Sequence, residues 1–345
     1  MRSSIDTPTI PSPLPRAVPR PARRSPQPGP GLVARLEQLG KTLRPTPHVP
    51  LAMPGMHLFA KLEYVNPVGS IKDRPAFWIL KRAAERGEIC DQTTVIESSS
   101  GNFATALATF TRLVGLRFIP VIDPNISAAY ESFLRRTCTT VVKVEKRDDT
   151  GGFLKTRLEM VRNLCARTPH AYWTNQYGNP DAVDAHYQLT AGEICAEFDS
   201  LDYAFIGVST GGTIAGMSRR LKERYPKVKI IAVDTRGSVI FGDAPRKRHI
   251  PGVGSSIVPP LVTRAAIDDV VLIPESETAA ACRELLLTHG LFAGGSSGTA
   301  YAAIKRYAKQ LVGATVLFLC ADRGTPYLDT VFDPNWTARL ELELV

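Results

Sequence analysis

The pattern of hydrophobic and polar residues changes repeatedly along the chain from Gly31 onward, as short β-branched runs alternate with helix-like stretches. Short runs rich in β-branched residues predict strands, and longer mixed stretches between them predict helices. Strands that alternate with helices are typical of mainly parallel sheets covered by helices on both faces, and 345 residues allow about two such domains. The predicted strands are residues 94–96, 117–122, 141–144, 204–208, 229–233, 270–273 and 315–319, and the predicted helices are residues 102–114, 152–168, 213–224, 275–289 and 299–312.

One further strand-like run, residues 58–65, ends in a turn of sequence NPVGSIKDR at residues 66–74, and a helix is predicted from Pro75. Lys72 therefore lies at or just before a helix N-terminus. The helix dipole disfavours a cation there, and packing on an apolar helix would desolvate the amine. Both effects lower the pKa of Lys72 and make it a better nucleophile for Schiff-base chemistry. The alternative is an ordinary exposed Lys-Asp-Arg turn.

Three turns that follow a strand and precede a helix contain small and hydroxyl-bearing residues. Parallel sheets bind their ligands at such turns. Residues 97–103 (ESSSGNF) offer N–H groups and hydroxyls to a carboxylate, and Asn102 can bond a phenolate oxygen. Residues 209–213 (STGGT) can surround a phosphate, and residues 293–298 (AGGSSG) admit a flat ring whose nitrogen a serine can bond. Each turn alone also fits a simple helix cap. Together with Lys72 they supply what pyridoxal 5′-phosphate needs.

With these motifs in this order, the chain resembles the fold-type II pyridoxal-phosphate enzymes of the cysteine synthase and cystathionine β-synthase family, over about residues 31–330. Residues 43–47 (LRPTP) and 175–180 (NQYGNP) extend the resemblance. It implies an α/β fold with two three-layer domains and mainly parallel sheets, of the tryptophan synthase β-like type. Residues 31–62 and 180–345 would form the larger, phosphate-binding domain, and residues 63–179 a smaller mobile domain with the substrate loop. The family also implies a homodimer.

The resemblance assigns roles to individual residues. Lys72 would form the Schiff base and move the α-proton of the substrate. Ser296 would face the pyridine nitrogen, and because a neutral serine does not protonate that nitrogen fully, expulsion of a β-substituent is favoured over long-lived carbanions. The other implied contacts are Asn102 at the cofactor's 3′-oxygen, Ser209, Thr210, Gly211, Gly212 and Thr213 at its phosphate, and Ser98, Ser99, Ser100 and Gln176 at the substrate.

The sequence differs from those of ordinary cysteine synthases at Phe103, at Ser209 and in a basic segment at residues 236–249. These differences indicate a nucleophile other than sulfide. Residues 234–242 and 250–256 resemble the siderophore branch that makes 2,3-diaminopropionate. That branch joins O-phospho-L-serine to the amino group of L-glutamate, giving N-(2-amino-2-carboxyethyl)-L-glutamate and phosphate. A sulfhydrylase acting on O-acetyl- or O-phosphoserine and a catalytically silent relative are the alternatives.

Two anionic substrates require cations. Arg157 and Tyr177 are the candidates for recognition of phosphoserine, and Lys155 and the basic residues 246–248 are further candidates. A solvated basic loop is the other interpretation of residues 246–248.

Composition bears on the setting of the protein. No apolar run approaches the about 20 residues of a membrane span. The six cysteines lie far apart, which argues against a metal cluster or a disulfide framework and fits a reducing cytoplasm. Residues 1–30 hold nine prolines and five arginines against the single acid Asp6, so they predict a disordered tail. Such a tail allows contact with nucleic acid, but a solvated extension is favoured.

Overall fold

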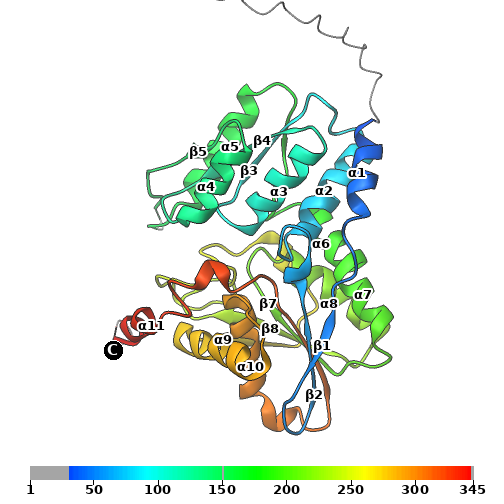
Figure 1. Ribbon diagram of the computed structural model, residues 1–345, viewed down its shortest axis with the longest axis vertical. Coiled ribbons are helices and arrows are strands. Elements are labelled where there is room, and N and C mark those ends of the chain that lie inside the picture. Colours follow the sequence, from blue (N-terminus) through cyan, green and yellow to red (C-terminus); the bar gives the residue numbers. More distant parts are fainter. Residues whose placement is uncertain (1–30, 150, 343–345) are drawn as a thin grey trace, which may run out of the picture. The chain divides into compact units, whose positions relative to one another are not determined.

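The computed structural model describes residues 31–149 and 151–342, and the predicted tail, residues 1–30, lies outside them. Two sheets lie within one compact unit (Figure 1). All neighbouring strands are parallel except the first two, as the alternation of strands and helices predicts. In order, the larger sheet contains β1 (His48–Leu51), β2 (His57–Lys61), β10 (Thr315–Leu319), β7 (Tyr203–Gly207), β8 (Lys229–Thr235) and β9 (Asp269–Ile273), and the smaller contains β5 (Val142–Lys143), β4 (Arg117–Ile122), β3 (Thr94–Ser98) and β6 (Ala171–Trp173).

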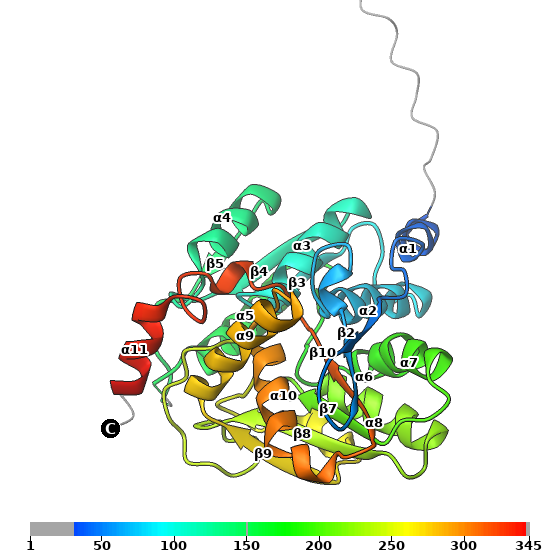
Figure 2. The ribbon, with the colours of Figure 1, turned by 60° about the horizontal axis from the view of Figure 1, so that its bottom comes forward.

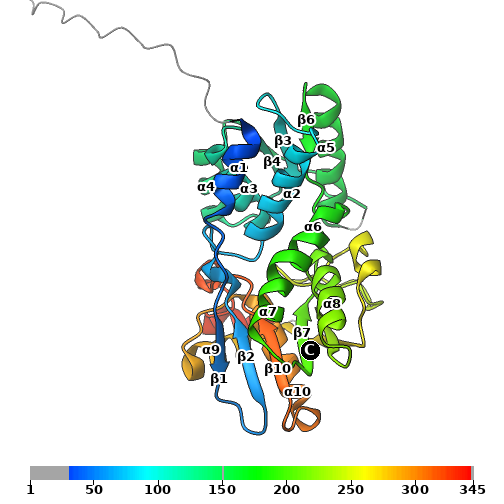
Figure 3. The same ribbon diagram turned by 90° about the vertical axis from the view of Figure 1, so that its right-hand side faces the viewer.

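Helices cover both faces of each sheet, because successive strand residues point to opposite faces and both are apolar. In β3, Val95 packs in one buried cluster and Ile96 in another. In β7, Phe205 and Ile206 divide in the same way. Figures 2 and 3 show the resulting layers. One face of the larger sheet is covered by α8 (Gly212–Arg224) and α7 (Ala191–Glu197), and the other face by α9 (Glu275–His289) and α10 (Gly295–Arg306). One face of the smaller sheet is covered by α5 (Leu154–Arg167), and the other face by α3 (Asn102–Leu113) and α2 (Asp73–Glu85).

The remaining helices pack around these layers. None of the helices in the described ranges is long and apolar enough to cross a lipid bilayer. They are α1 (Leu32–Gly40), α4 (Ala128–Thr137), α6 (Pro180–Ala185) and α11 (Pro334–Leu342), the π-helix η2 (His186–Thr190), and the short 3-10 helices η1 (Glu63–Val65), η3 (Pro260–Arg264), η4 (Ala308–Gln310) and η5 (Thr325–Tyr327).

The seven predicted strands are confirmed within one or two residues at each end, but two element predictions were wrong. The run at residues 58–65 is a strand only to Lys61, because the chain then turns into η1 and brings Glu63 against Arg74. The helix predicted for residues 299–312 begins at Gly295 and ends at Arg306. Its glycines allow this early start because they pack closely: a Cβ on Gly298 would lie 2.3 Å from the Cys282 sulfur.

A buried ion cluster fixes the start of α2 against α7. Arg74 Nε lies 2.6 Å from Glu63 Oε2, and Arg74 Nη1 lies 2.6 Å from Glu193 Oε1. Lys61 Nζ lies 2.7 Å from the other oxygen of Glu193. Burial would raise the pKa of Glu63, but the Arg74 guanidinium lowers it to about 2. The last residue of the NPVGSIKDR turn is therefore a structural anchor for α2.

Candidate active site

One pocket brings together residues from three of the predicted segments. It lies at the carboxyl ends of β7 and β10, where parallel sheets bind ligands. The turn before α2, the turn after β7 and the first turn of α10 all line it. Its lining includes the predicted residues Lys72, Ser209, Thr210, Gly211, Thr213 and Ser296, with Leu319 and Ala321 at the end of β10.

Lys72 is the N-cap residue of α2, as predicted. Gly69, with φ of 107°, makes the turn that precedes it, and Asp73 Oδ2 accepts a hydrogen bond of 2.6 Å from Val68 N–H. The Ile71 N–H donates to the Ala321 carbonyl, 2.8 Å away, which ties the turn to the end of β10. Burial lowers the pKa of Lys72, while the Asp322 carboxylate opposes that shift. Burial thus favours the neutral, nucleophilic form of the amine more than water does.

The turn after β7 leads directly into α8, which begins at Gly212. Gly211 has φ of 87°, and a Cβ there would lie 2.7 Å from the Val262 backbone nitrogen, so only glycine fits without movement. The N-terminus of α8 presents N–H groups and a positive dipole end to the pocket. Ser209 donates to the Gly254 carbonyl at 3.1 Å, and the Thr213 hydroxyl lies 3.2 Å from His186 Nε2. This geometry suits a phosphate group.

Ser296 lies in the first turn of α10, and Gly252 lies beside it in the lining of the pocket. A Cβ on Gly252 would lie 4.0 Å from the Ser296 hydroxyl oxygen. A Cβ on Gly294, just before α10, would lie 2.0 Å from Asp322 Oδ1, so this position also requires glycine. The small residues leave room beside the Ser296 hydroxyl, as expected for a flat ring.

The substrate loop after β3 is held on both sides. Asn102 donates from Nδ2 to Asp322 Oδ2 at 2.7 Å, and its Oδ1 accepts from the Tyr130 hydroxyl at 2.6 Å. The Ser99 hydroxyl accepts from the Ala104 N–H. Ser98 is fully buried, and its hydroxyl has no hydrogen-bond partner among the described residues. Asn102 therefore links the loop to the segment that follows β10.

Glu97 and Gln176 connect this loop to the segment after β6. Glu97 accepts from the Thr174 hydroxyl at 2.6 Å and from the Gln176 N–H at 3.2 Å. Gln176 Nε2 donates to the Ser98 carbonyl at 2.9 Å. Burial raises the pKa of Glu97 to about 7. Gln176 therefore lies beside the loop that follows β3, and its contact with the substrate stays a prediction.

Arg157 and Tyr177, the predicted phosphoserine residues, lie in one polar cluster next to that loop. Arg157 Nη1 donates to the Ser100 hydroxyl at 2.9 Å, and its Nε lies 3.2 Å from Asp123 Oδ2. Burial raises the pKa of Tyr177, and the positive charges of Arg157 and Arg248 oppose that shift. The structure thus joins Arg157 to Ser100, and the charge of Arg157 also acts on the Tyr177 phenol.

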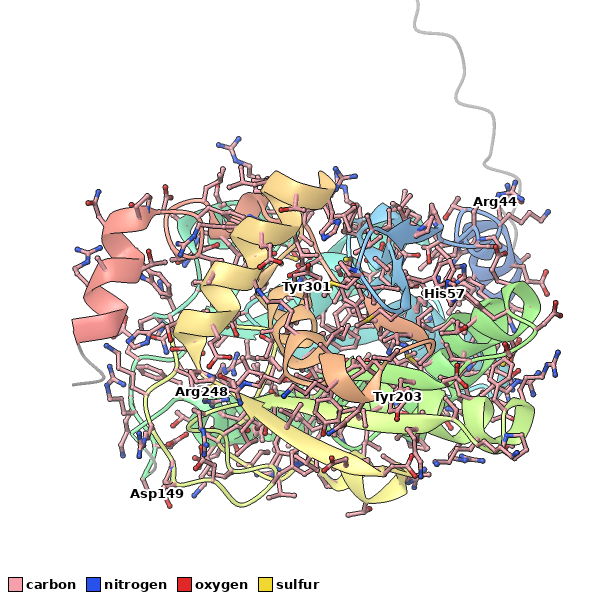
Figure 4. The ribbon with its side chains drawn as sticks, turned by 90° about the horizontal axis from the view of Figure 1, so that it is seen from below. Arg44, His57, Asp149, Tyr203, Arg248 and Tyr301 are labelled. Carbon is pink, nitrogen blue, oxygen red and sulfur yellow. The ribbon has the colours of Figure 1, made fainter. Side chains whose placement is uncertain are left out.

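The basic residues at 246–248 do not act alike. Arg246 and Lys247 are exposed, which agrees with a solvated loop. Arg248 (labelled in Figure 4) is partly buried, and its Nε is buried without a hydrogen-bond partner among the described residues. Burial lowers the pKa of this guanidinium. Lys155 is an exposed partner of Asp149, so it is not part of the cluster around Tyr177.

Sequence reasoning missed three residues of the site: Asp322, Tyr130 and His186. Asp322 lies three residues after the end of the predicted strand that became β10, so the rule that located the other turns could have found it. Tyr130 lies on α4, which was not predicted, and His186 lies on η2. Neither carries a local signal of its role.

Comparisons with known proteins agree with this geometry. A family described as "Pyridoxal-phosphate dependent enzyme" matches residues 40–322. The chain belongs to this family. Two relatives named N-(2-amino-2-carboxyethyl)-L-glutamate synthase, from Ralstonia nicotianae and Cupriavidus metallidurans, are 46% and 44% identical, and each alignment covers 82% of this chain and 84% of the relative. The crystal structure of the O-acetylserine dependent cystathionine beta-synthase from Helicobacter pylori is similar with a TM-score of 0.78 at 30% identity, covering 84% of this chain and 96% of that one.

The pocket of this pyridoxal-phosphate dependent enzyme fits its cofactor. It supplies a buried primary amine, a helix N-terminus with hydroxyl groups, and a serine hydroxyl beside a space lined by glycine. Asn102 gives one Nδ2 hydrogen to Asp322 and keeps the second for another acceptor. The predicted fold class, with mainly parallel sheets of the fold-type II enzymes, is confirmed, and pyridoxal 5′-phosphate is the expected cofactor.

Proposed function

We propose that this enzyme joins O-phospho-L-serine to the amino group of L-glutamate and forms N-(2-amino-2-carboxyethyl)-L-glutamate and phosphate. The names of two relatives that are 46% and 44% identical support this activity. The observation in the structure that carries the proposal is the 2.9 Å hydrogen bond from Arg157 to Ser100. It holds a guanidinium against the substrate loop, and a guanidinium binds a phosphate through paired hydrogen bonds.

Different residues around the pocket would contact different parts of the cofactor. Bound pyridoxal phosphate withdraws electrons from the α-carbon of an amino-acid substrate. Lys72, whose pKa is lowered by burial, is the base that removes the α-proton. Ser296 would face the ring nitrogen and Asn102 the 3′-oxygen. The phosphate would be held by hydroxyl and N–H groups at the start of α8, from Ser209, Thr210, Gly211, Gly212 and Thr213.

The substrate carboxylate would bind to the loop that follows β3. Ser99 and Ser100 offer hydroxyl and N–H groups at the start of α3, where the dipole favours an anion. Gln176 lies beside them and already contacts the carbonyl of Ser98. Ser98 itself is the buried end of β3, so its contribution comes through the backbone of the loop.

The cluster around Tyr177 fits two anionic substrates. Arg157 is oriented by Asp123 and reaches Ser100, so it is placed for the phosphate of phosphoserine. The charge of Arg248, in the segment between β8 and η3, acts on the same phenol, and its buried Nε has no hydrogen-bond partner among the described residues. A second guanidinium is suited to a carboxylate of glutamate.

A mobile smaller domain of residues 63–179 follows from the same proposal. The substrate loop, Arg157 and Tyr177 all belong to it, whereas the phosphate-binding turn and Ser296 belong to the larger sheet. Closure of the two parts would shield the reacting centre from water. Assembly as a homodimer, and use of the product as a precursor of 2,3-diaminopropionate for siderophores, complete the proposal.

The experiment is a competition between nucleophiles. The purified protein with pyridoxal phosphate is given O-phospho-L-serine with equimolar L-glutamate and sulfide, and mass spectrometry follows both products. We expect the glutamate adduct to form faster than cysteine, with release of one phosphate for each product. Faster formation of cysteine would contradict this proposal and would identify the enzyme as a sulfhydrylase.

A Lys72→Ala variant is the control for catalysis. It should lose about 10²- to 10⁴-fold or more in product formation, because it removes both the covalent anchor and the base. Wild-type protein that neither shows the visible absorbance of a lysine-bound cofactor nor forms any product would favour the catalytically silent alternative.

A further inference from the structure

His186 is a buried histidine behind the phosphate-binding turn. It begins the π-helix η2, His186–Thr190, between α6 and α7, and its exposed fraction is 2%. Single π-helical turns are rare and frequently occur at functional sites. His186 lies 27 positions before Thr213, the last residue of the phosphate-binding turn.

Close packing of η2 on α8 brings the two residues together. Gly216 lies one turn after Thr213 on α8, and a Cβ there would lie 2.2 Å from the Val183 carbonyl oxygen and 2.9 Å from the His186 Cβ. Only glycine therefore allows the two helices to approach this closely. The approach places the imidazole against the side of α8 from which Thr213 enters the pocket.

Both ring nitrogens of His186 are hydrogen-bonded. Nδ1 lies 2.9 Å from the Thr190 hydroxyl oxygen, and Nε2 lies 3.2 Å from the Thr213 hydroxyl oxygen. Burial, with a smaller effect of Lys72, lowers the pKa of His186 to about 3, so the ring is neutral. A neutral imidazole donates from one nitrogen and accepts at the other.

The hydrogen bonds that the phosphate can accept determine which ring nitrogen of His186 donates. A phosphate dianion accepts hydrogen bonds only, and the Thr213 hydroxyl has a single proton. If Nε2 accepted that proton, the hydroxyl would present only lone pairs to the phosphate. If Nε2–H donates to Thr213, the hydroxyl proton is free for the phosphate. Nδ1 must then accept, and the Thr190 hydroxyl is its donor.

We propose that Thr190 and His186 form a positioning relay that holds the Thr213 hydroxyl as a donor to the cofactor phosphate. Thr190 donates to Nδ1, Nε2–H donates to Thr213, and Thr213 donates to the phosphate. His186 is a positioning residue, because it acts through Thr213. The inference rests on the phosphate role proposed for Thr213 and is independent of the identity of the nucleophile.

The test compares two forms of the cofactor. Protein freed of cofactor is titrated with pyridoxal 5′-phosphate and with pyridoxal, which has the same aldehyde and no phosphate, and binding is followed by absorbance. His186→Leu should weaken the binding of pyridoxal phosphate about tenfold and leave that of pyridoxal unchanged. Thr190→Val should act in the same direction, whereas Thr190→Ser keeps the donor and should resemble the wild type.

His186→Gln is the rescue variant, because the amide nitrogen of glutamine can occupy the place of Nε2–H. It should restore most of the preference for pyridoxal phosphate. Equal weakening of both ligands in His186→Leu would show a general structural role and overturn the relay. Unchanged binding in His186→Leu, or failure of a folded His186→Gln to recover the preference, would overturn it as well.

A measurement without a disabling variant complements the titration. In ¹⁵N-histidine-labelled holoprotein, the signals of His186 are assigned by their disappearance in His186→Gln. We expect a neutral ring with the proton on Nε2, and a proton on Nδ1 would overturn the relay. If Thr213→Val leaves the preference for pyridoxal phosphate unchanged, the phosphate role of Thr213 fails together with the relay. A wild-type enzyme that prefers sulfide to glutamate leaves the relay standing.

Discussion

The side-chain amide of Asn102 and the carboxylate of Asp322 are joined by a hydrogen bond of 2.7 Å across 220 positions of sequence. The Tyr130 hydroxyl holds the other end of the same amide at 2.6 Å. The orientation of Asn102 is therefore fixed from both sides, and one hydrogen of its Nδ2 remains for a ligand.

We predict that Asp322→Asn lowers kcat/KM for O-phospho-L-serine by about 10- to 100-fold, because a charge-assisted hydrogen bond to Asn102 is replaced by a neutral one. Steady-state kinetics with quantified phosphate release provide the measurement. Tyr327→Phe is the matched control, since Tyr327 donates to the same oxygen of Asp322 at 2.8 Å and makes no hydrogen bond with Asn102 among the described residues. An equal loss in both variants would contradict a specific role for the Asn102 contact.

Arg157→Met should reduce kcat/KM for O-phospho-L-serine by about 10- to 100-fold, because the phosphate loses a charged hydrogen-bond donor. O-acetyl-L-serine, which has no phosphate, should be affected much less. Arg162→Met on the exposed side of the same helix is the control for loss of charge. If both substrates lose activity equally, Arg157 supports the loop at Ser100 and does not recognise phosphate.

Gly211→Ala should destabilise the protein and abolish retention of the cofactor during gel filtration. A Cβ at this position would lie 2.7 Å from the Val262 nitrogen, and φ is 87°. Gly313→Ala is the control, because Gly313 has φ of 76° but a Cβ added there would meet no atom within 4 Å. It should cost only about 1–2 kcal/mol in urea unfolding, the cost of the left-handed conformation alone. Equal losses in the two variants would show that the contact with Val262 is easily relieved.

The dependence of stability on pH should report the burial of His186. Its folded pKa is about 3 and its ordinary value is 6.5, so between these values the unfolded state binds more protons. The contribution of His186 is fully present above pH 6.5 and is lost as pH falls toward 3. The free energy of unfolding of the wild type should therefore fall more steeply on acidification than that of His186→Gln, by up to about 1.4 kcal/mol per pH unit. The free energy of unfolding is measured by urea titration at pH 6.5 and at pH 5 for both proteins. An equal loss between these two pH values in the wild type and in His186→Gln would contradict this assignment.

Much of the site could be predicted because the local sequence specifies the structure of each part. Lys72 and the turn at 209–213 each follow or precede a clear apolar run, so their place at the end of a sheet follows from the strand that precedes them. Gly211 is required by its own backbone conformation. Such signals need no knowledge of the rest of the chain.

The parts that were missed depend on contacts between distant segments. The first turn of α10 is helical from Gly295 because Ile250 and Cys282 pack on its glycines, which the sequence of that turn does not reveal. β6 is short and only partly buried, and it forms because β3 pairs with it. His186 gains its role through its contacts with Thr213 and Thr190, and Tyr130 through its contact with Asn102.

The joining of the turn before α2 to the end of β10 has a consequence for biosynthesis. Ile71 N–H bonds the carbonyl of Ala321, and Asn102 bonds Asp322, so the pocket joins an early and a late segment of the chain. The complete pocket around Lys72 cannot form until residue 322 has left the exit tunnel of the ribosome. Cofactor capture would therefore follow the synthesis of residue 322, and chains released before that point would carry an unreacted Lys72.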